Sequence, residues 1–133
     1  MDNKSYQVTI KGLCFDESGR LLLVKEASGY WDLPGGRMEH GEDFHSTLTR
    51  ECLEEMGISC EILDSTPYWA WPAVNYDRLW KIVACFRIRL PHYAFTASDE
   101  CVALDFFAPD ELVTLRLAPQ IQPLQNWLPR HGG

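Results

Sequence analysis

The 133-residue sequence lacks several features that mark whole classes of protein. No apolar run approaches the roughly 20 residues needed to cross a bilayer, so no membrane span is predicted. The first ten residues, MDNKSYQVTI, lack a basic segment followed by an apolar block, so we expect no secretory signal. There is no internal repeat, low-complexity tract or linker either. The length therefore favours a single domain, residues 1–133, that buries a sizeable core.

Cysteine is present but lacks the spacing of a metal or redox motif. The five cysteines are an odd number, form no C-x-x-C pair and lie in apolar or strand-like segments, at positions 14, 52, 60, 85 and 101. We interpret them as reduced, buried thiols. That interpretation indicates a cytoplasmic protein rather than a disulfide-bonded secreted one.

Positive charge is scarce. Twelve Lys and Arg residues face 19 Asp and Glu residues, which gives a net charge of -7. This balance argues against general binding to nucleic acid or to anionic membranes, because Lys and Arg supply that attraction. A small phosphorylated substrate remains compatible with the sequence, provided that a side chain or a metal supplies a local cation.

Apolar residues make up 46% of the chain, as expected for a globular fold. Strand patterns cover 6–15 and 20–26, which the turn DESG joins into a predicted hairpin, and then 58–62, 68–71, 79–90 and 102–107. The segment GYWDLPGG (29–36) predicts a sharp turn, and helices are predicted over 43–56, 109–115 and 119–128, the last interrupted by Pro123. Strands and helices alternate without strict βαβ repetition, which favours an α/β fold with a mixed sheet flanked by helices.

The predicted helix 43–56 carries an unusual group of acids. Its apolar residues recur every fourth position and Gly57 stands where a helix C-cap belongs, whereas Glu51, Glu54 and Glu55 border the apolar stripe. Like charges three and four residues apart repel by a few tenths of a kcal/mol per pair. A solvated helix face is the ordinary explanation for such a run. The alternative is a hard divalent cation, because the three carboxylates can converge on one ion next to a glycine turn.

The segment from Gly36 to Ile58 resembles the signature of the Nudix hydrolases. Gly36, Glu42 and the run RECLEEMGI (50–58) reproduce the family pattern Gly-x5-Glu-x7-Arg-Glu-U-x-Glu-Glu-x-Gly-U, in which U is a bulky aliphatic residue. Cys52 in the first U place is the one departure, and it is apolar enough to pack in a core. The resemblance implies the Nudix fold, an α/β/α sandwich with a mixed sheet. It also implies Mg2+- or Mn2+-dependent hydrolysis of a nucleoside diphosphate linked to another group X.

The resemblance also implies roles for individual residues. Glu51, Glu54, Glu55 and the carbonyl of Gly35 would bind the metal, Arg50 would hold the carboxylates, and Glu42 would support them. The catalytic base stays open between Glu100, Glu54 and Asp99.

Substrate contacts are less determined by the sequence. Lys25 and Arg37 flank the glycine turn and would meet phosphates, or they are ordinary surface cations. His40 and His45 occupy variable positions of the signature and are interpreted as surface residues. Seven aromatic residues lie near the expected cleft, and we expect one or two to stack on a base, with Trp31 and Tyr76 as candidates.

The resemblance leaves the substrate open. Family subgroups are told apart by a residue beyond the signature. Pro72 lies near the position where a proline suggests ADP-ribose, and Tyr76 lies near the position where a tyrosine suggests diadenosine polyphosphates, so the two residues favour different substrates. The compact chain is similar to MutT-like members, which favours a (d)NTP, with ADP-ribose, other sugar nucleotides and dinucleotides next. The partners expected are this nucleotide and, at most, a second copy of the chain as a homodimer. A Nudix-fold module that senses a nucleotide without cleaving it is the alternative from another class.

Overall fold

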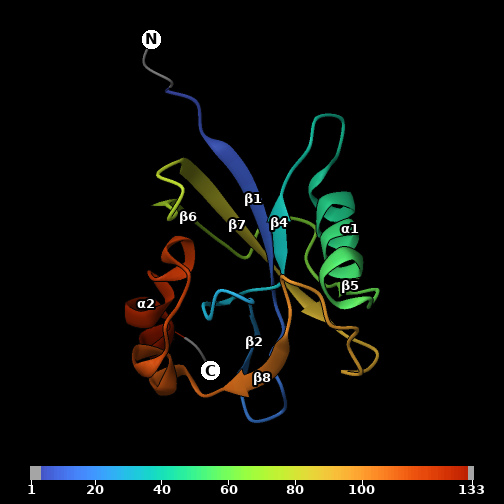
Figure 1. Ribbon diagram of the computed structural model, residues 1–133, viewed down its shortest axis with the longest axis vertical. Helices are drawn as coiled ribbons and strands as arrows, with labels where there is room; N and C mark the ends of the chain where they lie inside the picture. Colours follow the sequence, from blue (N-terminus) through green and yellow to red (C-terminus); the bar gives the residue numbers. More distant parts are fainter. Residues whose placement is uncertain (1–3, 132–133) are drawn as a thin grey trace.

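The computed structural model describes residues 4–131, without the side chains of 127 and 129–131. Figure 1 shows strands in the centre of the molecule with a helix on each side. The elements, in chain order, are β1 (Gln7–Leu13), β2 (Leu21–Lys25), β3 (Trp31–Asp32), β4 (Gly35–Arg37), α1 (Phe44–Met56), β5 (Glu61–Ile62), β6 (Trp69–Val74), β7 (Trp80–Arg89), β8 (Ala103–Phe107), the 3-10 helices η1 (Pro109–Thr114) and η2 (Pro119–Ile121), and α2 (Leu124–His131). No described helix is long and apolar enough to cross a membrane.

Strand β1 is the centre of the larger sheet. It pairs antiparallel with β4 and parallel with β7, and β7 in turn pairs with both β5 and β6. A second sheet has the order β3-β2-β8, with antiparallel pairs. The combination of one parallel and several antiparallel pairs confirms the predicted mixed sheet.

The two faces of the strands bury two separate apolar layers. In β2, Leu22 and Val24 pack on the α1 side, whereas Leu21 and Leu23 pack on the α2 side. This alternation follows from the two-residue period of a strand. A strand with apolar residues on both faces needs cover on both faces, so the chain forms the expected α/β/α sandwich (Figure 1).

The predicted hairpin over 6–15 and 20–26 is wrong beyond its turn. The chain does turn at DESG, and Phe15 bridges Leu21, but β1 and β2 then join different sheets. Local turn chemistry fixes the reversal, whereas the partners of each strand come from distant segments that a local pattern does not identify.

Other predicted elements changed in extent or type. The turn over 29–36 contains the short strands β3 and β4, and the expected strand 58–62 is regular only at Glu61–Ile62. The expected helix 109–115 is the 3-10 helix η1. The helix 119–128 is interrupted before Pro123, as predicted, into η2 and α2, because proline has no N–H to donate.

Helix α1 agrees with its prediction and has defined ends. The side chain of Asp43 accepts a hydrogen bond from the Ser46 amide, and the Ser46 hydroxyl bonds to Asp43 in return, which forms a capping box. Gly57 ends the helix in the left-handed region, at φ 71°. These caps fix the start and the end of the helix that carries the acidic group.

We predict that Asp43→Ala lowers the free energy of unfolding by about 1 kcal/mol, because the first turn loses its side-chain acceptor. Urea unfolding followed by circular dichroism measures the change. Asp43→Asn is the matched control, since its amide oxygen still accepts from the Ser46 amide. Equal losses in the two variants would contradict the capping role.

Candidate active site

Three carboxylates from two parts of the chain meet at one edge of α1. One oxygen from each of Glu51, Glu55 and Glu100 lies within 4.8 Å of the others. Glu51 and Glu55 are one helical turn apart, and Glu100 comes from the segment before β8. That segment is tied to the helix, because the Ser98 hydroxyl donates to the Glu55 carbonyl oxygen at 2.7 Å.

Two glycines of β4 allow two close approaches, Gly36 to the Glu51 side chain of α1 and Gly35 to the backbone of β1. A Cβ on Gly36 would lie 2.5 Å from the carboxyl carbon of Glu51, and a Cβ on Gly35 would lie 2.1 Å from the Ile10 carbonyl oxygen. Gly35 also has φ +125°, a backbone conformation that residues other than glycine rarely adopt. Its amide donates to a Glu55 oxygen at 2.7 Å. The glycine turn therefore holds the buried carboxylate directly.

Burial makes this group of acids electrostatically costly without a cation. Glu55 is only 5% exposed, and burial raises its pKa well above the usual range. Burial also raises the pKa of Glu51, and the charge of Glu100 adds to both effects. A divalent ion would remove this cost, and carboxylate oxygens are the donors that Mg2+ and Mn2+ prefer. The residues present thus fit a divalent metal.

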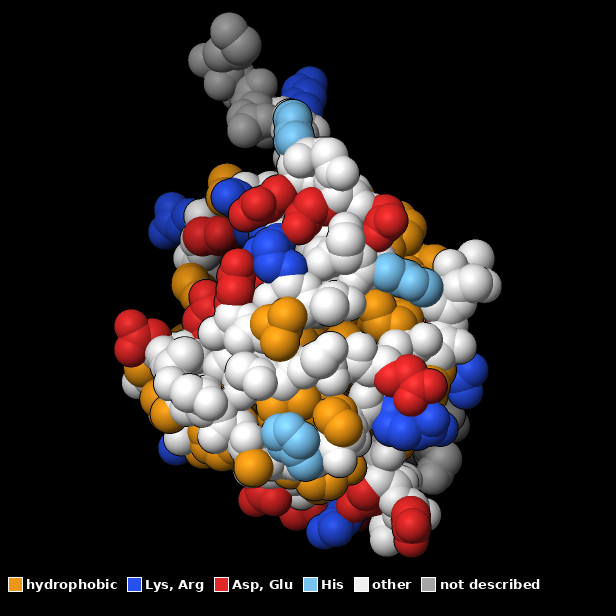
Figure 2. All heavy atoms as spheres, turned by 90° about the vertical axis from the view of Figure 1, so that its right-hand side faces the viewer, with side chains coloured by type: hydrophobic (Ala, Val, Ile, Leu, Met, Phe, Trp, Pro, Cys, Tyr) orange, Lys and Arg blue, Asp and Glu red, His pale blue; other side chains and the backbone are white. Residues whose placement is uncertain are grey.

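Arg50 connects the acids on the outer side of the helix. Its guanidinium lies 2.7 Å from a Glu42 oxygen, 3.0 Å from Glu51 and 3.2 Å from Glu54, and it also donates to the Arg37 carbonyl oxygen. The hydrogen bonds from Arg50 lower the pKa of Glu42 to about 2. Figure 2 shows the acidic side chains gathered on the face of the molecule where α1 lies.

Glu54 takes a different position from its two neighbours on the helix. Its side chain is 56% exposed, and it bonds to Arg50 outside the group of three carboxylates. Glu54 does line the same cleft as that group. The Gly35 carbonyl oxygen, the other expected metal donor, accepts a hydrogen bond from the buried Lys11 ammonium at 2.9 Å.

The carboxylates open onto a cleft of about 470 Å³. Besides the acids, it is lined by the turn around Gly35 and by Glu26, Ser28, Arg37, Tyr76 and Asp99. The Tyr76 ring stacks on Tyr30 with 5.8 Å between centroids, and Arg116 covers Tyr30 at 4.1 Å. The structure therefore brings Arg37 and Tyr76 to the cleft. Lys25 and Trp31 do not line it; the Lys25 ammonium lies over the Trp31 ring, which packs against Phe107.

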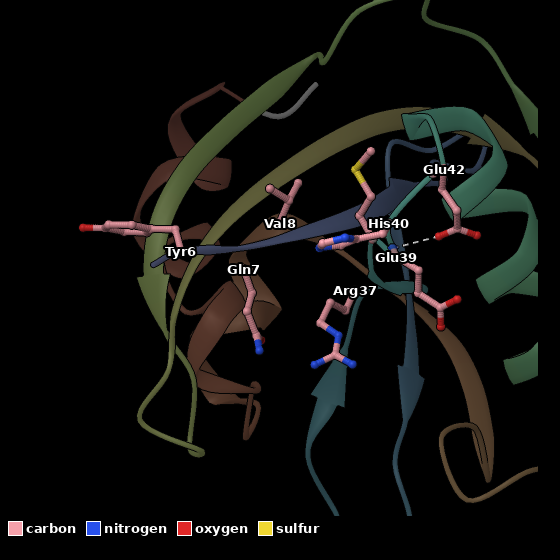
Figure 3. Close-up of a pocket in the computed structure, with 9 residues that line it drawn as sticks. Tyr6, Gln7, Val8, Arg37, Glu39, His40 and Glu42 are labelled. Atoms are coloured by element: carbon pink, nitrogen blue, oxygen red, sulfur yellow. Dashed lines mark hydrogen bonds between the residues drawn. The ribbon is translucent and has the colours of Figure 1, made fainter. Parts of the chain in front are cut away.

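A second pocket, of about 590 Å³, adjoins the cleft across Arg37 and Glu39. Figure 3 shows Gln7 and Arg37 pointing to one side of β1 and Val8 to the other, with His40 between them. Within residues 4–131 no ion-pair partner is found for the Arg37 guanidinium. His40 thus lies beside the site, whereas His45 bonds to the Asp64 carbonyl oxygen and packs on Phe86.

Sequence reasoning missed several groups at the cleft. Glu26 and Ser28 follow β2 and gave no signal, because they stand in an ordinary polar turn. Lys11, which is buried behind the glycine turn and does not line the cleft, did give a signal. It is the only Lys or Arg in the strand QVTIKGL, at a position that alternation places on a buried face. A lysine there requires internal partners, which are the Asp32 carboxylate and the carbonyl oxygens of Leu33 and Gly35.

Comparison with known proteins agrees with the fold and with the sequence signature. A family model described as the NUDIX domain matches residues 5–129. The chain belongs to the Nudix family. The sequence resemblance is thereby confirmed, and members of this family generally use divalent cations.

Relatives of this Nudix domain are found in bacteria and animals. A MutT-like protein of Streptomyces ambofaciens is 34% identical over 109 residues, which cover 80% of this chain and 67% of that protein. The human nucleoside diphosphate-linked moiety X motif 6 is 31% identical over 118 residues, which cover 81% of this chain but only 36% of that protein. The solved MutT protein of Methanosarcina mazei superposes with a TM-score of 0.74 at 22% identity, over 98% of this chain and 97% of that one. At that identity the match supports the fold alone.

We predict a pH-dependent stability difference between the protein and its Glu42→Gln variant. The folded pKa of Glu42, about 2, lies below its ordinary 4.5, so the ionised carboxylate stabilises the fold above pH 4.5. That stabilisation is lost as the pH falls toward 2. Thermal unfolding of both proteins from pH 6 to pH 2 should show a gap in Tm that narrows with acid. A gap that stays constant to pH 2 would contradict the assignment.

Proposed function

We propose that this Nudix domain hydrolyses the pyrophosphate linkage of a nucleoside diphosphate linked to X, with Mg2+ or Mn2+. The observation that carries the proposal is the meeting of Glu51, Glu55 and Glu100 within 4.8 Å of one another beside an open cleft. A site that only stabilised the helix would not need three acids so close to one another, two of them partly or fully buried.

Glu51, Glu55 and Glu100 would hold the metal, with Glu54 available from the rim of the cleft. When bound, the metal neutralises phosphate oxygens and makes a water more acidic. Arg50 keeps the carboxylates of Glu51 and Glu54 in place through its contacts with both.

On the substrate side, Arg37 and Tyr76 both line the cleft. The Arg37 guanidinium would bind a phosphate, because its fork of N–H donors matches phosphate oxygens. The exposed face of Tyr76 would stack on the base.

The proton of the attacking water needs an acceptor in this cleft. Glu100 is our first candidate, because it is exposed and comes from outside the helix, and because one of its two oxygens would stay available for the proton while the other binds the metal. Glu54 is the second, since it lines the cleft, but Arg50 occupies both of its oxygens.

For the substrate we propose a (d)NTP first, because the chain is similar to a MutT-like protein. A cytoplasmic setting is proposed separately, because the five cysteines are all free thiols. ADP-ribose, another sugar nucleotide or a dinucleotide is the second candidate. The adjoining pocket favours it, because a group X beyond the pyrophosphate would find space past Arg37.

A panel of (d)NTPs, ADP-ribose, dinucleotides and sugar nucleotides tests the proposal. Release of phosphate or pyrophosphate is measured with Mg2+ or Mn2+, beside Glu55→Gln as the blank. We expect turnover of at least one compound, lost in the variant, because the amide cannot replace a ligating carboxylate. Tight nucleotide binding without any turnover would favour a sensor instead.

The pH-rate profiles of Glu100→Gln and Glu54→Gln distinguish the two candidate bases. We expect Glu100→Gln to lower kcat by about 10²- to 10⁴-fold and to remove the limb of the profile on which a base must be ionised. Glu54→Gln should lower kcat while keeping that limb. A normal limb in Glu100→Gln would transfer the role to Glu54.

A further inference from the structure

A lysine is buried directly behind the glycine turn. Lys11 lies in β1 opposite Gly35 of β4, and it is 3% exposed. Its ammonium donates to the carbonyl oxygens of Leu33 at 3.1 Å and Gly35 at 2.9 Å, and it pairs with Asp32 at 3.3 Å. One cation thus contacts three residues of the segment that leads into β4, namely Asp32, Leu33 and Gly35.

The partner acid is just as enclosed. Asp32 is 3% exposed, and its two oxygens accept from the Leu33 amide at 2.7 Å and from the Gln120 amide group at 3.0 Å. The pair is therefore fully hydrogen-bonded and shielded from water. A buried ion pair is weak support for stability, because apolar residues of similar size often serve as well. Another role is needed to explain these two charges.

The arrangement of the Gly35 peptide suggests that role. Its carbonyl oxygen is bound by Lys11, and its amide is bound by a Glu55 carboxylate oxygen at 2.7 Å. The path from Lys11 through Gly35 to Glu55 contains only two hydrogen bonds. The amide and the carbonyl belong to the two peptide groups on either side of the Gly35 Cα, so a change of φ or ψ at Gly35 would break at least one of these bonds. With the carbonyl held by Lys11, the amide stays directed at the most buried carboxylate of the site.

The position of the charge also matters. Arg50 meets the acids from the outer side of α1, whereas Lys11 stands behind the glycine turn on the inner side. Arg50 thus pairs with Glu51 directly, whereas the nearby charge of Lys11 favours the ionised form of Glu55. The other buried lysine, Lys81, bonds to Gln7 and Asp77 and contacts neither glycine.

We infer that the Lys11–Asp32 pair is a positioning device for the metal site, which locks the backbone at Gly35 and through it the Glu55 carboxylate. This inference rests on the proposed metal-dependent function. Neither residue lines the cleft, and both are buried, so the pair would act on metal affinity and on kcat rather than on nucleotide binding.

The test removes both charges together. Lys11→Met with Asp32→Asn replaces the pair by neutral groups of similar size and leaves no buried charge unpaired. We expect the double variant to bind Mn2+ about tenfold to a hundredfold more weakly, measured by electron paramagnetic resonance of free Mn2+. At saturating metal, kcat should fall by a similar factor, with KM for the nucleotide unchanged.

The matched control removes an ion pair far from the cleft. Arg87→Met with Asp64→Asn breaks the 2.7 Å pair between Arg87 of β7 and Asp64, neither of which lines the cleft, and Mn2+ binding should stay at the level of the unmodified protein. Unchanged Mn2+ affinity in the Lys11 and Asp32 variant would overturn the inference. Equal weakening in both double variants would overturn it too, because a general loss of structure would then explain the effect.

A third protein keeps the test decisive if the Asp32→Asn substitution is poorly tolerated. Lys11→Met with Asp32→Leu gives an apolar pair, and the same weakening of Mn2+ binding is expected once its circular dichroism matches that of the unmodified protein. The inference and the proposed function fail in different ways. If the unmodified protein neither binds Mn2+ nor turns over a substrate, the proposed function is refuted. If both charge-free variants bind Mn2+ normally, only the positioning role of the Lys11–Asp32 pair is refuted.

Discussion

The close approach of α1 to β4 is the contact on which the site depends. At position 36, the absence of a side chain leaves room for the Glu51 carboxyl group, whose carbon would lie 2.5 Å from a Cβ there. At position 35 only glycine fits, because a Cβ would lie 2.1 Å from the Ile10 carbonyl oxygen of β1. With no side chains between them, the helix places its acids against the backbone of the strand. The same contact lets the Gly35 amide reach Glu55. The contact that packs α1 on β4 is therefore also the contact that positions the acidic side chains.

Charge balance explains the surroundings of this contact. Three acids meet at the edge of the helix, and burial works against the ionised form of Glu55 above all. Arg50 pairs with Glu51, the nearby charge of Lys11 favours the ionised form of Glu55, and a divalent ion would complete the balance. The excess of acidic residues in the whole chain is compatible with a phosphorylated substrate, because Arg37 lines the cleft where the phosphates would lie.

The sequence was sufficient for features that follow from local pattern. Helix α1 with its Gly57 cap, the interruption before Pro123 and the mixed sheet were all predictable from periodicity and turn residues. The separation of β1 from β2 was not, because strand partners depend on distant segments. For the site, the spacing on α1 predicted that Glu51 and Glu55 share one edge, but spacing alone could not show that Glu54 turns outward to Arg50. Nor could it show that Lys11 and Asp32 pair, since they are distant in sequence and meet only when β1 pairs with β4.

The central claim is that Glu51, Glu55 and Glu100 hold one divalent ion. A crystal structure of the protein with Mn2+, with the anomalous signal of manganese recorded, tests it most directly. The account predicts an anomalous peak at direct coordination distance from an oxygen of each of these three residues. A manganese ion coordinated by Glu54 without Glu100 would contradict it. So would the absence of a peak near the glycine turn in crystals soaked at a Mn2+ concentration that gives full activity in solution.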